Sequence, residues 1–454
     1  MTLSLVESVR ELLVRGDQQA GLGAFTAVDN AAALAAAAAL DRMPADRRGP
    51  LYGTVLAVKD NIDVAGFSTT AGTAALCGRV PAADAPVVRS LREAGAVVLG
   101  KTNMHELAYG VTSDNGYFGR VAHPLDTVRT PGGSSGGTAV AVAAGLATAG
   151  LGTETGCSVR VPAALCGLIG FRPTHGRYSL NGVVPVSTTR DTIGVITSSV
   201  EQAAALDAVI AGHAETTAAS GMRLGAPRSL FCQGVPSDLL DQFDQRLAEL
   251  ARAGFTLVAA DPPQECVGLA AACGMSIALY ETPRSIDAYL AEHRWPLRFP
   301  DIVADIASPD VASLLRPLVD GGVPPDAYRK AMEYERVRLA ELMDGYMTRH
   351  RLDALVMPTA PITAPVALGG DRILVDGQDV SAFPVFTRNA DISSVLGWPA
   401  VSVPAFRDSA GLPFGIDLQA RPGHDGPLLA LARRCEDAWR GAWRSAVEGD
   451  PGDA

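Results

Sequence analysis

The chain has 454 residues, a formal net charge of −11, and 48% hydrophobic but only 19% charged residues. This composition excludes an intrinsically disordered protein, which combines low hydrophobicity with high charge density, and the acidic balance argues against a nucleic-acid partner. The seven cysteines are widely spaced and form no Cys-x-x-Cys pair, so the sequence predicts neither a disulfide framework nor a zinc site. We therefore expect reduced thiols and a cytoplasmic location.

Helical and strand patterns alternate along the chain, beginning with an amphipathic helix at 3–15. This alternation predicts an α/β fold, with a single large, mixed, mostly parallel twisted β-sheet covered by α-helices on both faces. No Ser/Gly linker or charge run divides the chain, so we expect one domain over residues 1–454. Further helices are expected at 31–40, 84–94, 134–147, 199–212, 236–253 and 326–349, and strands at 53–59, 96–99, 223–227, 255–260, 354–357 and 400–404.

Three stretches depart from this regular pattern. Residues 262–325 predict a helical insertion, and the Pro- and Gly-rich residues 359–393 predict a long loop, so a variable insertion is expected over about 262–393. Residues 130–153 carry no charge, and a membrane span could have that length. The run Pro-Gly-Gly-Ser-Ser-Gly-Gly opens this stretch, however, so its apolar part is only about 15 residues, which is short for a membrane span. A buried helix followed by a buried strand fits better, and we expect no membrane association.

One apparent nucleotide motif is rejected on physical grounds. Residues 95–102 match the phosphate-loop pattern, but their middle four residues, Ala-Val-Val-Leu, favour a strand and follow a helix. A phosphate loop instead needs a flexible loop between a strand and a helix. The seven histidines form no ligand cluster. The sequence therefore predicts no cofactor and no metal.

Three other features carry chemistry. Lys59 ends an apolar strand, where desolvation lowers a lysine pKa and allows the neutral amine to act as a base; the alternative is an ordinary surface lysine. Residues 132–137, Gly-Gly-Ser-Ser-Gly-Gly, permit close approach of other groups, although they could form a plain loop. The Gly-rich turn around Ser158 can direct several backbone N–H groups at one point, as an oxyanion hole requires, or can simply connect two strands.

Taken together, the three features resemble the amidase signature family. Lys59, the Gly-Gly-Ser-Ser-Gly-Gly run and the 24-residue spacing from Ser134 to Ser158 match its pattern. Other segments that look like the family lie at 58–62, 100–106, 166–174, 190–194, 397–404 and 412–416. The resemblance implies the amidase signature fold and hydrolysis of an amide through an acyl-enzyme.

The resemblance also implies a role for each site residue. Ser158 would be the nucleophile, Lys59 the base and Ser134 the bridge between them, with a cis peptide bond at Gly133–Ser134. The remaining roles follow from the same family pattern. The backbone N–H groups of Thr155, Gly156, Cys157 and Ser158 would hold the oxyanion, Ser135, Thr153, Arg160 and Asp191 would support the site, and Ala108, Tyr109 and Ile193 would contact substrate.

Two positions depart from the family pattern, which reads Asp and then Gly-Gly-Ser. Glu154 lengthens the carboxylate by one methylene, and Cys157 adds a side chain where glycine would leave room. Cys157 could reduce the acyl pocket, force an unfavourable backbone angle, or itself be the nucleophile, although only Ser158 has the family spacing.

The family segments are most similar to those of arylacetamide hydrolases, acting on compounds such as indoleacetamide and mandelamide. We therefore expect the partner of this protein to be a small, aromatic amide substrate. The oligomeric state to test is a homodimer. Three alternatives stay open: an aryl carbamate or anilide hydrolase, the glutaminase subunit of a tRNA-dependent amidotransferase, and a non-catalytic family member that only binds ligand.

Overall fold

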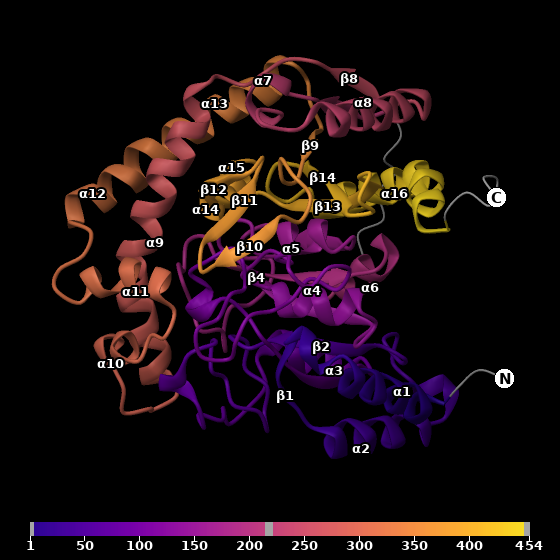
Figure 1. Cartoon of the computed structure of the whole chain (residues 1–454), viewed down its shortest axis with the longest axis vertical. Coiled ribbons are helices and arrows are strands. Elements are labelled where there is room, and N and C mark those ends of the chain that lie inside the picture. The colour runs from indigo at the N-terminus through magenta and orange to yellow at the C-terminus, as the bar shows by residue number, and fades with distance from the viewer. Residues whose placement is uncertain (1–3, 214–220, 449–454) are drawn as a thin grey trace.

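An eleven-stranded sheet forms the centre of the part of the chain that the computed structural model describes, residues 4–213 and 221–448. Helices cover both faces of this sheet, as predicted (Figure 1). The strands, in spatial order, are β1 (Phe25–Val28), β3 (Val97–Thr102), β2 (Val55–Lys59), β4 (Ala149–Glu154), β6 (Thr192–Thr197), β5 (Ile169–Arg172), β13 (Ala400–Arg407), β14 (Pro413–Gln419), β9 (Ala354–Pro358), β7 (Arg223–Gly225) and β8 (Thr256–Val258).

The sheet is mixed, as the sequence predicts, and its parallel pairs form two blocks. β2 pairs in parallel with β3 and β4, and β7 pairs in parallel with β8 and β9. The strands between these blocks pair antiparallel, so parallel pairing is less extensive than the sequence pattern suggests. The short turn between β13 and β14 is one cause, because a tight turn can join only antiparallel neighbours.

Alternating side chains of β2 show how the two faces are covered. Leu56 and Val58 enter the main core on one face, whereas Val55 and Ala57 pack into separate clusters on the other. The main-core face is covered by α3 (Pro86–Glu93), α6 (Val200–Ala211), α8 (Ser237–Arg252) and α16 (Asp425–Glu448). The other face carries α1 (Leu5–Gln18), α2 (Asn30–Asp41), α4 (Gly136–Ala143), α5 (Arg160–Leu165), α7 (Arg228–Phe231) and α15 (Asp391–Leu396).

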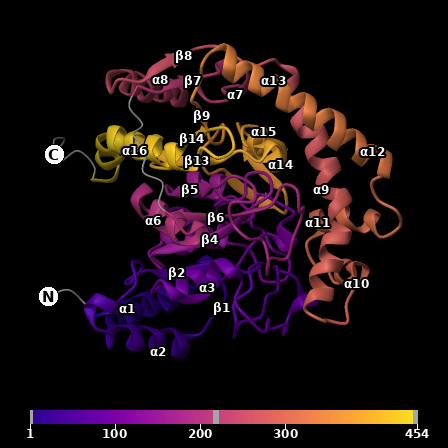
Figure 2. The same ribbon diagram turned by 180° about the vertical axis from the view of Figure 1, so that it is seen from behind.

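The predicted helical insertion forms an arm along one side of the molecule, opposite α1 and α16 (Figures 1 and 2). α9 is the one helix among the described residues that is long and apolar enough to cross a membrane, but many of its side chains are buried against the protein. The arm comprises α9 (Glu265–Glu292), α10 (Phe299–Ala304), α11 (Pro309–Leu315), α12 (Pro325–Lys330) and α13 (Arg336–Arg349), with a π-helical turn at Ala331–Glu335 that interrupts the helix expected at 326–349.

The stretch 359–393 is not the long loop that its Pro and Gly content suggests. It contains a second, three-stranded antiparallel sheet and the helix α14 (Ala382–Thr387). Short turns with positive φ at Gly369, Gly370 and Gly377 connect these strands, so the glycines mark hairpins and not an unstructured segment. The strands are β10 (Val366–Gly369), β11 (Arg372–Val375) and β12 (Gln378–Ser381).

Elsewhere the predicted helices and strands are present, with ends shifted by a few residues. The first helix begins at Leu5, and residue 3 lies outside the described residues. The apparent phosphate-loop motif is the buried strand β3, as its Ala-Val-Val-Leu core predicts. Its Lys101 is fully buried and lies 3.0 Å from the carboxylate of Asp60.

Candidate active site

Lys59 lies at the carboxyl end of β2 and is completely buried. Its Nζ lies 2.8 Å from the Ser134 Oγ, and it donates to the Thr153 Oγ1 at 2.8 Å and to the Thr153 carbonyl oxygen at 3.2 Å. Burial lowers the pKa of Lys59 to about 7, although the negative charges of Asp191 and Glu154 act in the opposite direction. A large share of Lys59 is therefore neutral near neutral pH, when it can accept a proton.

The Gly-Gly-Ser-Ser-Gly-Gly run leads from a loop into the first turn of α4, and its peptide bond Gly133–Ser134 is cis. Ser135 connects the two other parts of the site, because its N–H donates to the Ser158 carbonyl oxygen at 3.2 Å and its hydroxyl donates to the Thr153 carbonyl oxygen at 3.2 Å. Glycine at 152 permits this approach, since a Cβ there would lie 2.8 Å from the Ser135 hydroxyl oxygen.

Ser158 follows β4 in a turn that leads into α5. The turn leaves backbone donors free: among the described residues, the N–H groups of Gly156, Cys157 and Ser158 have no hydrogen-bond acceptor. The next N–H group is different, since that of Val159 donates to the Glu154 carboxylate at 2.9 Å. A set of adjacent free N–H groups beside a serine is the arrangement that can stabilise an oxyanion.

A buried ion-pair network holds this turn. Arg160 lies 2.7 Å from both the Glu154 and the Asp417 carboxylates, and all three side chains are buried. Burial alone would raise the pKa of Glu154, but the positive charges of Arg160 and Arg172 hold it below its ordinary value. Glu154 also accepts from the backbone N–H groups of Val159 and Arg160. The longer side chain at 154 therefore has a full set of partners.

Asp191 supports the opposite side of the turn. Its Oδ1 accepts from the Thr155 hydroxyl at 2.5 Å, and its Oδ2 accepts from the N–H groups of Val186 and Ser187. Burial raises the pKa of Asp191. These contacts connect the turn that carries Ser158 to the loop before β6.

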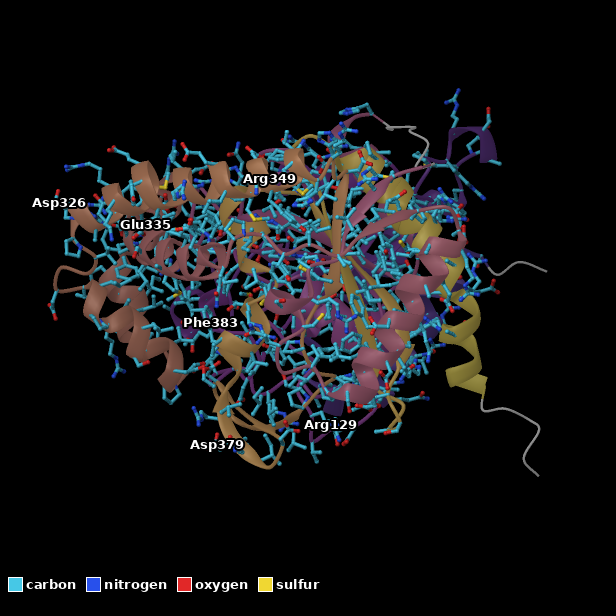
Figure 3. The ribbon with its side chains drawn as sticks, turned by 90° about the horizontal axis from the view of Figure 1, so that it is seen from above. Arg129, Asp326, Glu335, Arg349, Asp379 and Phe383 are labelled. Atoms are coloured by element: carbon cyan, nitrogen blue, oxygen red, sulfur yellow. The ribbon has the colours of Figure 1, made fainter. Side chains whose placement is uncertain are left out.

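A cavity opens above the turn. It encloses, with its mouth, about 590 Å³ of empty space. Phe383, on α14, lies on its wall, and Figure 3 labels this residue between the sheet and the arm. The cavity is lined by Ala108, Tyr109, Gly110, Val111, Thr155, Gly156, Cys157, Ser158, Val186, Arg190, Ala271, Gly274, Met275, Ala278, Leu314, Phe383, Thr387 and Asp391.

The predicted substrate contacts agree only partly with this cavity. Ala108 and Tyr109 line it, whereas Ile193 does not. Ile193 is fully buried in the main core, in the same cluster as Val195 and Leu151. The prediction for Ile193 was wrong, because the side-chain alternation along β6 directs Ile193 into the main core.

Several cavity residues were not among the predicted site residues. Arg190 and Asp391 form a charged pair at 3.5 Å on an otherwise mainly apolar wall. α9 and α11 of the arm supply Met275, Ala278 and Leu314. Only the position of Arg190 beside Asp191 could have indicated a role, because the other residues reach the cavity through tertiary packing.

Cys157 lies in the cavity wall and is fully buried among apolar side chains. Burial raises the pKa of its thiol well above the ordinary value, so little thiolate is available at neutral pH. Its φ is not positive, so the turn does not require glycine at 157. The unfavourable backbone angle, one of the possibilities raised for Cys157, is therefore absent.

Comparison with known proteins identifies the family of this chain. The family model described as Amidase matches residues 7–429. The chain belongs to the amidase family. The enzyme is 38% identical over 433 residues to an indoleacetamide hydrolase of Allorhizobium ampelinum (94% of this chain and 93% of the relative) and 37% identical over 446 residues to a mandelamide hydrolase of Pseudomonas putida (91% and 84%). A solved peptide amidase from Stenotrophomonas maltophilia superposes with a TM-score of 0.84 at 30% identity, covering 96% of this chain and 94% of that one.

The family assignment makes this chain a hydrolase that acts on amides. The mixed central sheet with its covering helices is the fold that it shares with the solved amidases. Among the described residues, no group of three or more His, Cys, Asp or Glu side chains is arranged to hold a metal ion.

Proposed function

We propose that this amidase hydrolyses a small aromatic primary amide to the corresponding acid and ammonia. Ser158 is the nucleophile, Ser134 relays its proton and Lys59 accepts it. The observation that carries this proposal is the buried Lys59 Nζ, with a pKa lowered to about 7, at 2.8 Å from the Ser134 hydroxyl oxygen.

Hydrogen-bond accounting supports the direction of proton transfer. A neutral lysine amine has two N–H donors and one lone pair. Thr153 offers two acceptors to Lys59, its carbonyl oxygen and its hydroxyl oxygen. If both N–H groups are used there, the lone pair faces the Ser134 hydroxyl and can take its proton. Ser134 then draws the proton of Ser158, whose oxygen attacks the amide carbonyl.

The rest of the cycle uses the same groups. The N–H groups of Thr155, Gly156, Cys157 and Ser158 stabilise the negative oxygen of the tetrahedral intermediate. Lys59 returns its proton through Ser134 to the leaving amine, and ammonia departs from an acyl-enzyme at Ser158. Water then hydrolyses the ester by the reverse relay and releases the acid.

The cavity favours an aromatic acyl group. Most of its lining is apolar, as is usual for sites that bind small molecules. The hydroxyl of Tyr109 bonds to Thr282, so its ring presents a mainly apolar surface to substrate. Two relatives are named for hydrolysis of indoleacetamide and mandelamide, which are both primary amides with an aromatic acyl group.

A product-release screen tests the substrate class. Purified protein is assayed for ammonia or amine release from phenylacetamide, indoleacetamide, mandelamide, an anilide, an aryl carbamate and glutamine. We expect the aryl primary amides to give the highest kcat/KM. Turnover of glutamine alone, and only with an added partner subunit, would reject the proposal, and preference for the anilide or carbamate would correct the leaving group.

A fluorophosphonate probe tests the nucleophile. We expect one covalent adduct, located on Ser158 by peptide mass spectrometry, and none in Ser158→Ala. Cys157→Ala is the matched control, because it alters the neighbouring side chain and keeps the serine. Absence of labelling in the wild type would favour a binding protein without catalysis.

A further inference from the structure

The buried imidazole of His105 connects the serine-bearing loop to the helical arm. Its backbone N–H donates to the Ser134 carbonyl oxygen at 3.2 Å, and its side chain is fully buried. The ring Nε2 lies 3.0 Å from a carboxylate oxygen of Asp310, the second residue of α11. His105 therefore contacts both the catalytic loop and an element more than 200 residues away in sequence.

The other ring nitrogen of His105 contacts a third segment of the chain. Its Nδ1 lies 3.3 Å from the Thr112 hydroxyl oxygen, and that hydroxyl donates to the Gly370 carbonyl oxygen at 2.7 Å. A carboxylate can only accept, so the Nε2–H donates to Asp310. The ring is thus held between the carboxylate of Asp310 and the hydroxyl of Thr112.

The neighbouring residue makes a second attachment to the same part of the arm. The Glu106 carboxylate is buried and accepts from the N–H of Ser308 at 2.7 Å and from that of Ala307 at 3.2 Å. The Ser308 hydroxyl accepts from the N–H of Gly116 at 2.9 Å. The start of α11 is thus fixed at adjacent points against the loop that follows β3.

This attachment bears on substrate because α11 forms part of the cavity wall. Leu314, on α11, lines the cavity together with Tyr109, which follows His105 and Glu106 in the same loop. A shift of α11 relative to that loop would move Leu314 away from Tyr109 and widen the cavity. A wider apolar cavity holds an aromatic ring with fewer contacts.

We propose that His105 and Asp310 are a positioning pair that fixes α11 as one wall of the acyl pocket and so determines the affinity for aromatic amides. The proposal rests on the proposed amide hydrolysis. Neither residue acts on the reacting atoms. Loss of the pair should therefore change KM and the preference among acyl groups, and leave the proton relay unchanged.

The test combines kinetics with hydrogen exchange. Asp310→Asn removes the charge and keeps the size; we expect KM for phenylacetamide to rise about tenfold, with kcat within about twofold and kcat/KM for acetamide within about twofold. Exchange of the backbone amides at 307–315 should speed up about tenfold. Asp305→Asn, at an exposed position between α10 and α11, is the matched control and should change neither quantity.

A double-mutant cycle tests whether the pair acts through the wall. Leu314→Ala should raise KM for phenylacetamide, and adding Asp310→Asn to it should raise KM little further. If the KM changes of the two single variants multiply in the double variant, the proposal is overturned. Faster exchange at 307–315 without a rise in KM would also overturn it. If the wild type hydrolyses no amide, the proposed function fails, and unchanged exchange in Asp310→Asn would separately overturn the pair.

Discussion

Lys59 and Ser134 are joined at 2.8 Å inside a fully buried site, and no bulk water reaches the lysine. Burying a charged amine is costly, so much of Lys59 is neutral and can accept a proton. The Ser134 hydroxyl at this distance can donate one. The burial of Lys59 is therefore what would allow it to act as a base.

The first prediction concerns the pH dependence of hydrolysis. Lys59 must be neutral to accept a proton, and its pKa is about 7. We expect kcat/KM to rise with pH, level off above about 8, and fall tenfold per unit well below 7. Initial rates with phenylacetamide between pH 5 and 9 measure this profile, and a flat profile through pH 6 would contradict Lys59 as the base.

The second prediction concerns stability. The pKa of Lys59 is about 7 in the folded protein and about 10.4 when unfolded, so between these values the unfolded chain binds more protons and stability rises with pH. Lys59→Met removes the free-energy cost of burying this ionisable amine. We expect the variant to be inactive but more stable than wild type by about 2–4 kcal/mol at pH 6, after allowing for lost hydrogen bonds.

Urea unfolding at pH 6 and pH 9 measures this difference. The gain from Lys59→Met should shrink at the higher pH, because the wild-type lysine is then neutral in the folded state. Lys330→Met, at an exposed lysine of the arm, is the control and should show no such trend. A constant gain at both pH values would mean that the ionisation of Lys59 is not its cause.

The third prediction concerns the buried network beside Ser158. Glu154→Gln leaves Arg160 and Arg172 without one buried counter-charge, and breaking such a pair costs about 3–5 kcal/mol. Urea unfolding should show this loss. Glu201→Gln breaks the exposed pair with Arg433 and should cost less than about 1 kcal/mol. Similar small losses in both variants would show that the network contributes little.

Much of the site could be predicted because its residues lie in short segments of unusual composition. A lysine at the end of an apolar strand and two Gly/Ser turns are visible in the sequence. The structure brings Lys59, Ser134 and Thr153 into direct contact, and places Ser158 in the turn that Ser135 holds.

The pocket could not be predicted in the same way. Leu314 and Asp391 reach the cavity from the arm and from α15, and no spacing in the sequence indicates which face of these helices is turned inward. The error at Ile193 has a related origin, since the sequence does not say which face of a strand meets the cavity. The hairpins of β10–β12 were missed because their glycines resemble those of a loop.

The last prediction concerns Cys157, whose thiol lies next to the proposed nucleophile. Its raised pKa and its apolar surroundings make it unreactive, and its φ accommodates other side chains. Cys157→Ala should therefore retain kcat within about threefold, because alanine leaves the turn and its N–H groups in place. Iodoacetamide should leave the wild-type activity unchanged at neutral pH, while labelling the exposed Cys77. Loss of more than about a hundredfold in kcat for Cys157→Ala, together with full activity in Ser158→Ala, would instead assign the nucleophile to the thiol.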